Sequence, residues 1–400
     1  MTKHIFPYQL CIFLFCWLTC MTTAVRAEGD VLNRIVYLSK SKGTVYVLLG
    51  MVSERTDFLF IYDSKVVDNE RLVKIEKGSR TLRQAITEIV GIQDLELRVV
   101  HPIRLMREML EKRMINYSQK PVYFTTFYRE GVQYKQKFRS LTEAVFKIYK
   151  SPVQSLYARE QVKLLKMSRI TDGLEQDTLI ARMSGGIDAC LQLDIINHLP
   201  DFLLADAHKD VYAYTSADVT IVGDHLVNVI SFEQKKEVKE PLYCGELYID
   251  SDNGALLQAQ IRIHPRYMKQ ATDMVVQRQA RRMKIVLQEL TYTISYKPWN
   301  GTYYINHVRG DLHFKVKQKR QWLGSSSLHT WFEMVTCKID TVGVTRFQRN
   351  ERIPTRTVFA DTHFKYDSDF WENFNVIPWE KQLVEVIEQL TSKIEKIEYE

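Results

Sequence analysis

Cysteine is scarce in this chain of 400 residues, and none of its six cysteines has the spacing of a metal or redox motif. Three of them lie within the first 20 residues, and the others are Cys190, Cys244 and Cys337. These three can form at most one disulfide, which would leave one thiol. Three buried, small hydrophobic side chains would explain the same pattern. The cysteines therefore do not indicate a disulfide-based scaffold or a metal centre.

Catalytic motifs are also lacking. The sequence contains no Gly-x-Ser-x-Gly, His-Glu-x-x-His, phosphate-binding loop or Cys-x-x-Cys. The nearest approach to a metal cluster is His198 and His208 around Asp201 and Asp206, and this group lacks the i, i+4 spacing of helical ligands. Surface histidines are the simpler interpretation. We therefore predict no catalytic, metal or cofactor site, and a protein that is not an enzyme.

The charge excess is too small to predict a nucleic-acid partner. The chain has 55 basic and 48 acidic residues and a net charge of +7, without a basic stripe interleaved with aromatic residues. Its 18 Phe, 21 Tyr and 6 Trp favour β-sheet, because aromatic side chains suit pleated surfaces.

The first 27 residues have the pattern of a secretory signal peptide. Lys3 and His4 precede an apolar run over residues 10–20, and Val25 and Ala27 stand at the −3 and −1 positions of a cleavage site. The run is shorter than the roughly 20 residues of a spanning helix. An uncleaved anchor and a lipoprotein signal at Cys20 are the alternatives. Export is therefore predicted, to the periplasm or to the periplasmic face of an outer membrane.

Residues 28–101 predict a compact unit with the order β-α-β-β-α-β. Helical periodicity begins near residue 43, and Ser79 is the expected N-cap of a second helix that ends at Gly91. The expected strands cover residues 34–39, 58–62, 72–75 and 95–99.

This unit resembles the short N-terminal domain shared by secretins and signalling TonB-dependent receptors, the STN domain. The similarity lies in residues 44–57, 58–67 and 73–90, and in the Lys-Gly-Ser-Arg-Thr-Leu sequence at 77–82 that enters the second helix. The resemblance implies docking to a periplasmic partner, a membrane-bound regulator or a neighbouring envelope protein.

The rest of the chain predicts a linking helix over 102–118, an antiparallel β domain over 119–377 and an amphipathic helix over 378–400. Gly223-Asp224, Asn253-Gly254 and Asn300-Gly301 are expected hairpin turns. Residues 134–138 are expected to form a strand, and residues 159–168 a helix. The predicted fold class is α+β: a small domain, then a large curved antiparallel sheet similar to a half-barrel, then a C-terminal helix.

Residues 103–398 resemble a Gram-negative envelope family labelled "carboxypeptidase-like regulatory domain-containing", whose sheet is similar to the half-barrel of periplasmic lipoprotein carriers. The label refers to an N-terminal sandwich and implies no peptidase; that sandwich has no counterpart here. The matching segments are 127–130 (FYRE), 143–145 (EAV), 148–150 (IYK), 245–250 (GELYID), 303–305 (YYI) and 369–371 (DFW).

Two groups of residues are candidate interaction sites. Phe127, Tyr128, Arg129 and Glu130 would form a contact point at a strand end; the alternative is a cross-strand charge pair beside a core Phe127. The second group is basic, and either meets anionic head groups at a membrane surface or forms a solvated strand edge. It consists of Arg278, Arg281 and Arg282.

The main functional hypothesis is a non-catalytic exported protein that binds or senses an envelope protein partner through the STN-like unit and the β domain. The alternative is a periplasmic carrier that holds a lipid or another hydrophobic ligand in a half-barrel cavity. A hydrolase is the third hypothesis, and no catalytic constellation supports it.

Overall fold

The structure is a computed structural model. Its contacts divide the chain into two compact units, Met1–Pro102 and Ile103–Glu400. The predicted signal peptide and C-terminal helix lie outside the residues that it describes. None of the helices in the described part of the chain is long and apolar enough to cross a membrane. The described residues are 32–39, 41–56, 59–61, 67–91, 98–153, 160–171, 181–183, 186–279, 283–318 and 324–355.

The small unit pairs its short strands two by two around a pair of helices. Its strands pair antiparallel as β1 with β5, β2 with β4 and β3 with β6, so β2 and β5 are additions to the predicted order. Leu48 and Val52 of one helix and Ile86 and Ile89 of the other belong to its buried core. The elements are β1 (Ile35–Leu38), β2 (Ser41–Thr44), α3 (Val45–Thr56), β3 (Leu59–Ile61), β4 (Leu72–Ile75), β5 (Gly78–Thr81), α4 (Leu82–Val90) and β6 (Arg98–Val100).

Helix α4 begins later than the sequence predicted. Its N-cap is Thr81, not Ser79, because Ser79 belongs to β5. Thr81 and Gln84 form a reciprocal capping box in which each side chain accepts a hydrogen bond from the other's backbone N–H. Gly91 ends the helix with a φ of 79°, as predicted.

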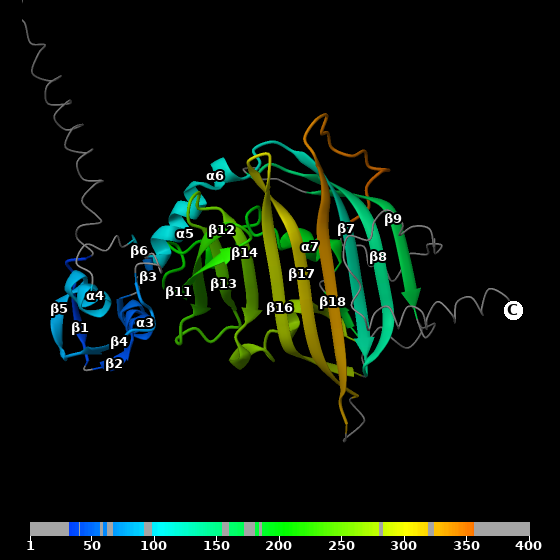
Figure 1. Cartoon of the computed structure of the whole chain (residues 1–400). Helices are drawn as coiled ribbons and strands as arrows, with labels where there is room; N and C mark the ends of the chain where they lie inside the picture. The colour runs from blue at the N-terminus through cyan, green and yellow to red at the C-terminus, as the bar shows by residue number, and fades with distance from the viewer. Residues whose placement is uncertain are drawn as a thin grey trace, which may run out of the picture. The chain divides into compact units, whose positions relative to one another are not determined.

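The large unit contains a ten-stranded open antiparallel sheet, which confirms the predicted fold class (Figure 1). The strand order is β11-β12-β13-β14-β16-β17-β18-β7-β8-β9. Its elements are α5 (Pro102–Glu111), α6 (Arg113–Asn116), β7 (Val122–Tyr134), β8 (Lys137–Lys150), β9 (Gln161–Thr171), β10 (Ala181–Met183), α7 (Ile187–Gln192), η2 (Asp201–Leu203), β11 (Tyr212–Val222), β12 (His225–Gln234), β13 (Tyr243–Asp250), β14 (Leu256–Ile263), η3 (Pro265–Tyr267), α8 (Thr272–Val275), β15 (Val276–Gln279), β16 (Met283–Trp299), β17 (Thr302–Gln318) and β18 (Ser326–Asp340).

The residues of the predicted turns located the hairpins of this sheet correctly. The sequence prediction was wrong at two other places. The three predicted glycine turns connect β11 to β12, β13 to β14 and β16 to β17. Residues 134–138 do not form one strand: Lys135 and Gln136, which have positive φ angles, make a tight turn between Tyr134 at the end of β7 and Lys137 at the start of β8. Residues 159–168 were expected to be helical, but β9 pairs along β8 and buries Val162 there. Tertiary pairing therefore overrides a weak local preference.

The two faces of the large sheet differ in chemistry. On the concave face, one row across neighbouring strands contains Ile230, Leu247, Ala259, Ile294 and Val308. The next row on the outer face is polar. Its members are Ser231, Glu246, Gln260, Thr293, Arg309, Glu333, Arg129 and Glu143. This alternation requires that the concave face be covered.

Two aromatic side chains of β18 fill the space above glycines on the neighbouring strands. Trp331 lies opposite Gly131 of β7, and Phe332 lies opposite Gly310 of β17. Their rings occupy the volume into which a Cβ atom of either glycine would project. The register at the centre of the sheet is therefore linked to the absence of side chains at these two positions.

We predict that Gly310→Ala lowers the free energy of unfolding by about 2 kcal/mol, because the new methyl group overlaps the buried ring of Phe332. Chemical denaturation followed by fluorescence measures the change. Gly50→Ala is the control: no atom lies within 4 Å of the added Cβ in α3, so no loss is expected. Equal stabilities of Gly310→Ala and the wild type would contradict the packing argument.

Candidate functional site

The concave face of the sheet is covered by residues 187–204, here called the inner segment, which contains α7 and η2. Figure 1 shows α7 enclosed by the curve of the sheet, behind β17 and β18. The ring of Phe202 stacks on Phe232 with centroids 4.4 Å apart, and Tyr214 donates a hydrogen bond to the carbonyl of Phe202. Ile187 and Leu203 are fully buried. The inner segment thus takes the place that a second sheet would have in a sandwich.

A buried ionic network fastens the middle of the inner segment to the sheet. The ammonium of Lys150 lies 2.7 Å from Asp194 Oδ2 and 2.8 Å from Glu160 Oε1. The hydroxyl of Tyr296 donates to Asp194 Oδ1 at 3.0 Å and accepts from the Ile196 N–H. A buried charge without a partner is costly, so these contacts fix where the segment lies.

The charges in this network stabilise one another more than burial opposes them. Burial alone would raise the pKa of Glu160, but Lys150 and His198 outweigh it and lower that pKa to about 2. For Lys150, burial lowers the pKa, and Asp194 with Glu160 reverses this and raises it above its ordinary value. Both groups therefore stay charged in the folded protein at neutral pH.

An arginine-rich pocket of about 480 Å³ adjoins the network through Glu160. Its lining includes Arg346, Arg349 and Arg352, together with Glu160, whose carboxylate is already paired with Lys150. Three arginines in one lining favour an anion such as a phosphate or a carboxylate. The pocket also includes Gln161, Ile353, Pro354 and Thr355.

The first predicted interaction site lies within the sheet. Phe127, Tyr128 and Arg129 are at most 3% exposed, and Arg129 Nε donates to Glu143 Oε1 at 2.6 Å. Burial outweighs Arg129 and raises the pKa of Glu143 to about 7. Tyr128 donates a hydrogen bond to Glu130. The structure thus has the cross-strand charge pair, and a partner-contact role for these four residues remains a prediction that their burial does not favour.

The second predicted site is only partly described. Arg278 belongs to β15, and Arg281 and Arg282 lie outside the described residues. A role in membrane contact therefore remains a prediction.

The histidines near residue 200 do not converge on one point. His198 lies beside Glu160, His208 beside Asp201, and Asp206 pairs with Arg107. All three cysteines of the described residues are unpaired.

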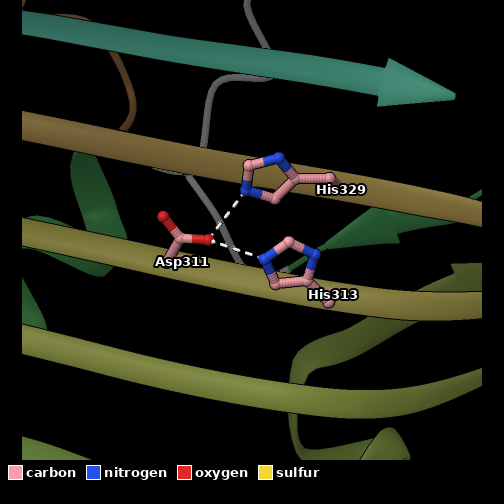
Figure 2. Close-up of side chains that lie close together, drawn as sticks. All are labelled: Asp311, His313 and His329. Carbon is pink, nitrogen blue, oxygen red and sulfur yellow. Dashed lines mark hydrogen bonds and ion pairs between the residues drawn. The ribbon is translucent and has the colours of Figure 1, made fainter. Parts of the chain in front are cut away.

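One cluster of ligating side chains was missed by the sequence analysis. Asp311 and His313 of β17 meet His329 of β18 on the outer face of the sheet (Figure 2). The Asp-x-His spacing places two side chains on the same face of a strand. Only the strand register, which the sequence did not show, brings the third side chain beside them.

No model of a known protein family matches this chain, and no curated protein matches it. Solved structures with a large antiparallel sheet match this chain in fold. A domain from Vibrio parahaemolyticus, whose name assigns it to outer-membrane lipoprotein sorting, is 10% identical with a TM-score of 0.27; the match covers 62% of this chain and 94% of that domain. A DUF1329 family protein from Desulfovibrio piger is 11% identical with a TM-score of 0.27, covering 62% and 96%.

MucB in its complex with MucA, from Pseudomonas aeruginosa, is 11% identical with a TM-score of 0.19; the match covers 58% of this chain and 93% of that one. At these scores the likeness does not extend to function. The STN-like and carboxypeptidase-like resemblances remain predictions.

We predict that Glu160→Gln lowers the free energy of unfolding at pH 7 by about 3 kcal/mol, because it leaves part of the charge of Lys150 without a partner. The pKa of Glu160 in the folded state, about 2, lies below the ordinary 4.5. Its contribution is therefore present above pH 4.5 and is lost as the pH falls toward 2. Urea denaturation between pH 2 and 7 measures both effects.

Glu351→Gln is the matched control, because it removes an exposed pair with Lys163 of β9. Its loss of stability should be much smaller than that of Glu160→Gln, because water screens an exposed ion pair. If the wild type and Glu160→Gln show the same pH dependence below pH 4.5, the assignment of this pKa is wrong.

Proposed function

We propose that this chain is an exported envelope protein that holds a hydrophobic ligand, an acyl chain, against the concave face of its large sheet. The observation that supports this function is the apolar concave face, which in the described part of the chain is covered by the short inner segment together with Tyr117. Curved sheets with apolar interiors suit ligands that bury most of their surface. The signal-peptide pattern of residues 1–27 supports a periplasmic location.

The inner segment is suited to give way to such a ligand. Its helix α7 has only six residues, and a helix of that length has little stability of its own. Contacts with the sheet therefore hold the segment, and the contacts of Asp194 with Lys150 and Tyr296 are among the polar ones. When these contacts open, the apolar surface beneath the segment becomes available to an acyl chain.

The arginine-rich pocket supports an anionic head group on this ligand. It adjoins Glu160, which is itself paired with Lys150 on the concave side. Arg346 lies over Tyr149 on the outer face of β8, so a fatty acid or a phospholipid with its chain on the concave face would pass the edge at β9 to place its carboxylate or phosphate among the arginines.

Lipid extraction and fatty-acid uptake test this proposal. We expect lipid in organic extracts of the protein purified without detergent, and saturable uptake of a fluorescent fatty acid by the delipidated protein. A neutral ester of the same probe should bind about tenfold more weakly, because it lacks the anionic group. Tyr296→Phe should speed uptake, because it removes the hydroxyl that joins Asp194 and Ile196.

Tyr304→Phe is the control, since Tyr304 lies on the neighbouring strand β17 and takes no part in this network. The carrier function would be ruled out if the wild type retained no lipid and if neither the wild type nor the two tyrosine variants took up the probe.

A second candidate function is docking of a protein partner on the small unit. Strand β1 buries Val36 and Leu38 and exposes Ile35 and Tyr37, which are 73% and 53% exposed. Paired apolar side chains on the outside of a short strand suit a partner that adds a strand or covers that face. The resemblance to the STN domain supports the same assignment.

We predict that Ile35→Ser with Tyr37→Ser abolishes capture of an envelope protein by the purified chain, since both residues lie on the exposed face of β1. Pull-down from envelope extract followed by mass spectrometry measures capture. Leu165→Ser is the control, because Leu165 is also exposed, at 45%, and lies in the large unit. An unchanged set of captured proteins would argue against docking at β1.

A further inference from the structure

The outer face of the large sheet carries a cluster of three ligating side chains that is separate from the concave face. Asp311 and His313 stand two residues apart on β17, and His313 lies directly opposite His329 of β18. Figure 2 shows the three side chains converging, with both imidazole rings turned toward the same carboxylate oxygen. The cluster comes from two adjacent, hydrogen-bonded strands.

The donor atoms are arranged as ligands of one ion would be. His329 Nε2 lies 2.7 Å and His313 Nε2 3.2 Å from Asp311 Oδ1, and all three donor atoms lie within 4.8 Å of one another. Metal–ligand bonds of about 2.0–2.2 Å place tetrahedral donors roughly 3.3 Å apart. The two imidazole rings are parallel, with centroids 4.1 Å apart. Small side-chain rotations are sufficient to admit an ion.

The surroundings hold the carboxylate in a ligating orientation. Arg309 Nη2 lies 3.1 Å from Asp311 Oδ2, the oxygen that does not face the histidines. This contact orients the carboxylate from the second shell and leaves Oδ1 for an ion. Arg309 also offsets the negative charge of Asp311, which favours moderate affinity over very tight binding.

The three side chains remain accessible to solvent. Their exposed fractions are 26% for Asp311, 46% for His313 and 23% for His329. An ion bound by these three groups would keep a coordination position open to water or to a carboxylate of another molecule. Because the strands are rigid supports, the site needs no folding step to form.

We propose that Asp311, His313 and His329 bind a divalent first-row transition-metal ion, with Zn²⁺ the best match. Two imidazole nitrogens and one carboxylate oxygen suit Zn²⁺ and its neighbours Co²⁺, Ni²⁺ and Cu²⁺. Mg²⁺ and Ca²⁺ prefer oxygen ligands throughout and are excluded by this donor set. The ion would cross-link β17 and β18 on the outer face.

Calorimetric titration of the untagged full chain with ZnCl₂ tests the site. We expect one Zn²⁺ per chain, and a dissociation constant raised at least about tenfold in each of Asp311→Asn, His313→Gln and His329→Gln. Titration with CoCl₂ gives a second measurement, because tetrahedral Co²⁺ absorbs strongly in the visible range. Melting temperatures without metal should match the wild type, since the substituted side chains are partly exposed.

His307→Gln is the matched control. His307 lies on the same face of β17 and contacts Glu333 at 2.7 Å, outside the cluster. It should leave both the stoichiometry and the affinity unchanged. The proposal is overturned if the wild type binds Zn²⁺ no more tightly than a variant that carries Asp311→Asn, His313→Gln and His329→Gln together. It is also overturned if His307→Gln weakens binding as much as His329→Gln does.

Discussion

The large sheet depends on one constraint: its concave face is apolar and has to be removed from water. Rows of aliphatic and aromatic side chains from ten strands face inward, and burial of apolar surface is the main favourable term in folding. The inner segment supplies the cover, with Phe202 stacked on Phe232 near its end. Where this cover lies, and how firmly it is held, sets how much of the face a ligand can reach.

The contacts that fix the middle of the inner segment to the sheet are polar. Lys150, Glu160, Asp194 and Tyr296 come from a strand end, a loop, the inner segment and another strand, and they satisfy one another away from water. A buried ion pair adds little net stability compared with an apolar contact, but it makes alternative positions of the segment unfavourable. The network thus selects one position for the segment, while the apolar contacts supply most of the binding energy.

The sequence predicted those features that depend on a few neighbouring residues. Asn300, Gly301 and Gly223 mark hairpins because their positive φ angles suit few other residues. Strand β9 was mistaken for a helix, because its short, mixed pattern fits both periods until β8 lies beside it.

The candidate sites were harder to predict from the sequence. Lys150 and Asp194 are far apart in the chain, and nothing near either residue indicates a buried partner. His329 joins Asp311 only through the register of β17 with β18, which also depends on Phe332 packing over Gly310.

The pairing of β18 with β7 has a consequence for biogenesis. Strand β7 lies near the start of the large unit and β18 near the end of its described part, so the two parts of the sheet cannot join until both strands are present. A chain delivered N-terminus first would hold β7, β8 and β9 as a three-stranded sheet in which β7, which later pairs with β18, is an unpaired edge strand. Such edges promote aggregation, and distant pairings slow folding. Protection of this edge until β18 is available therefore follows from the topology itself.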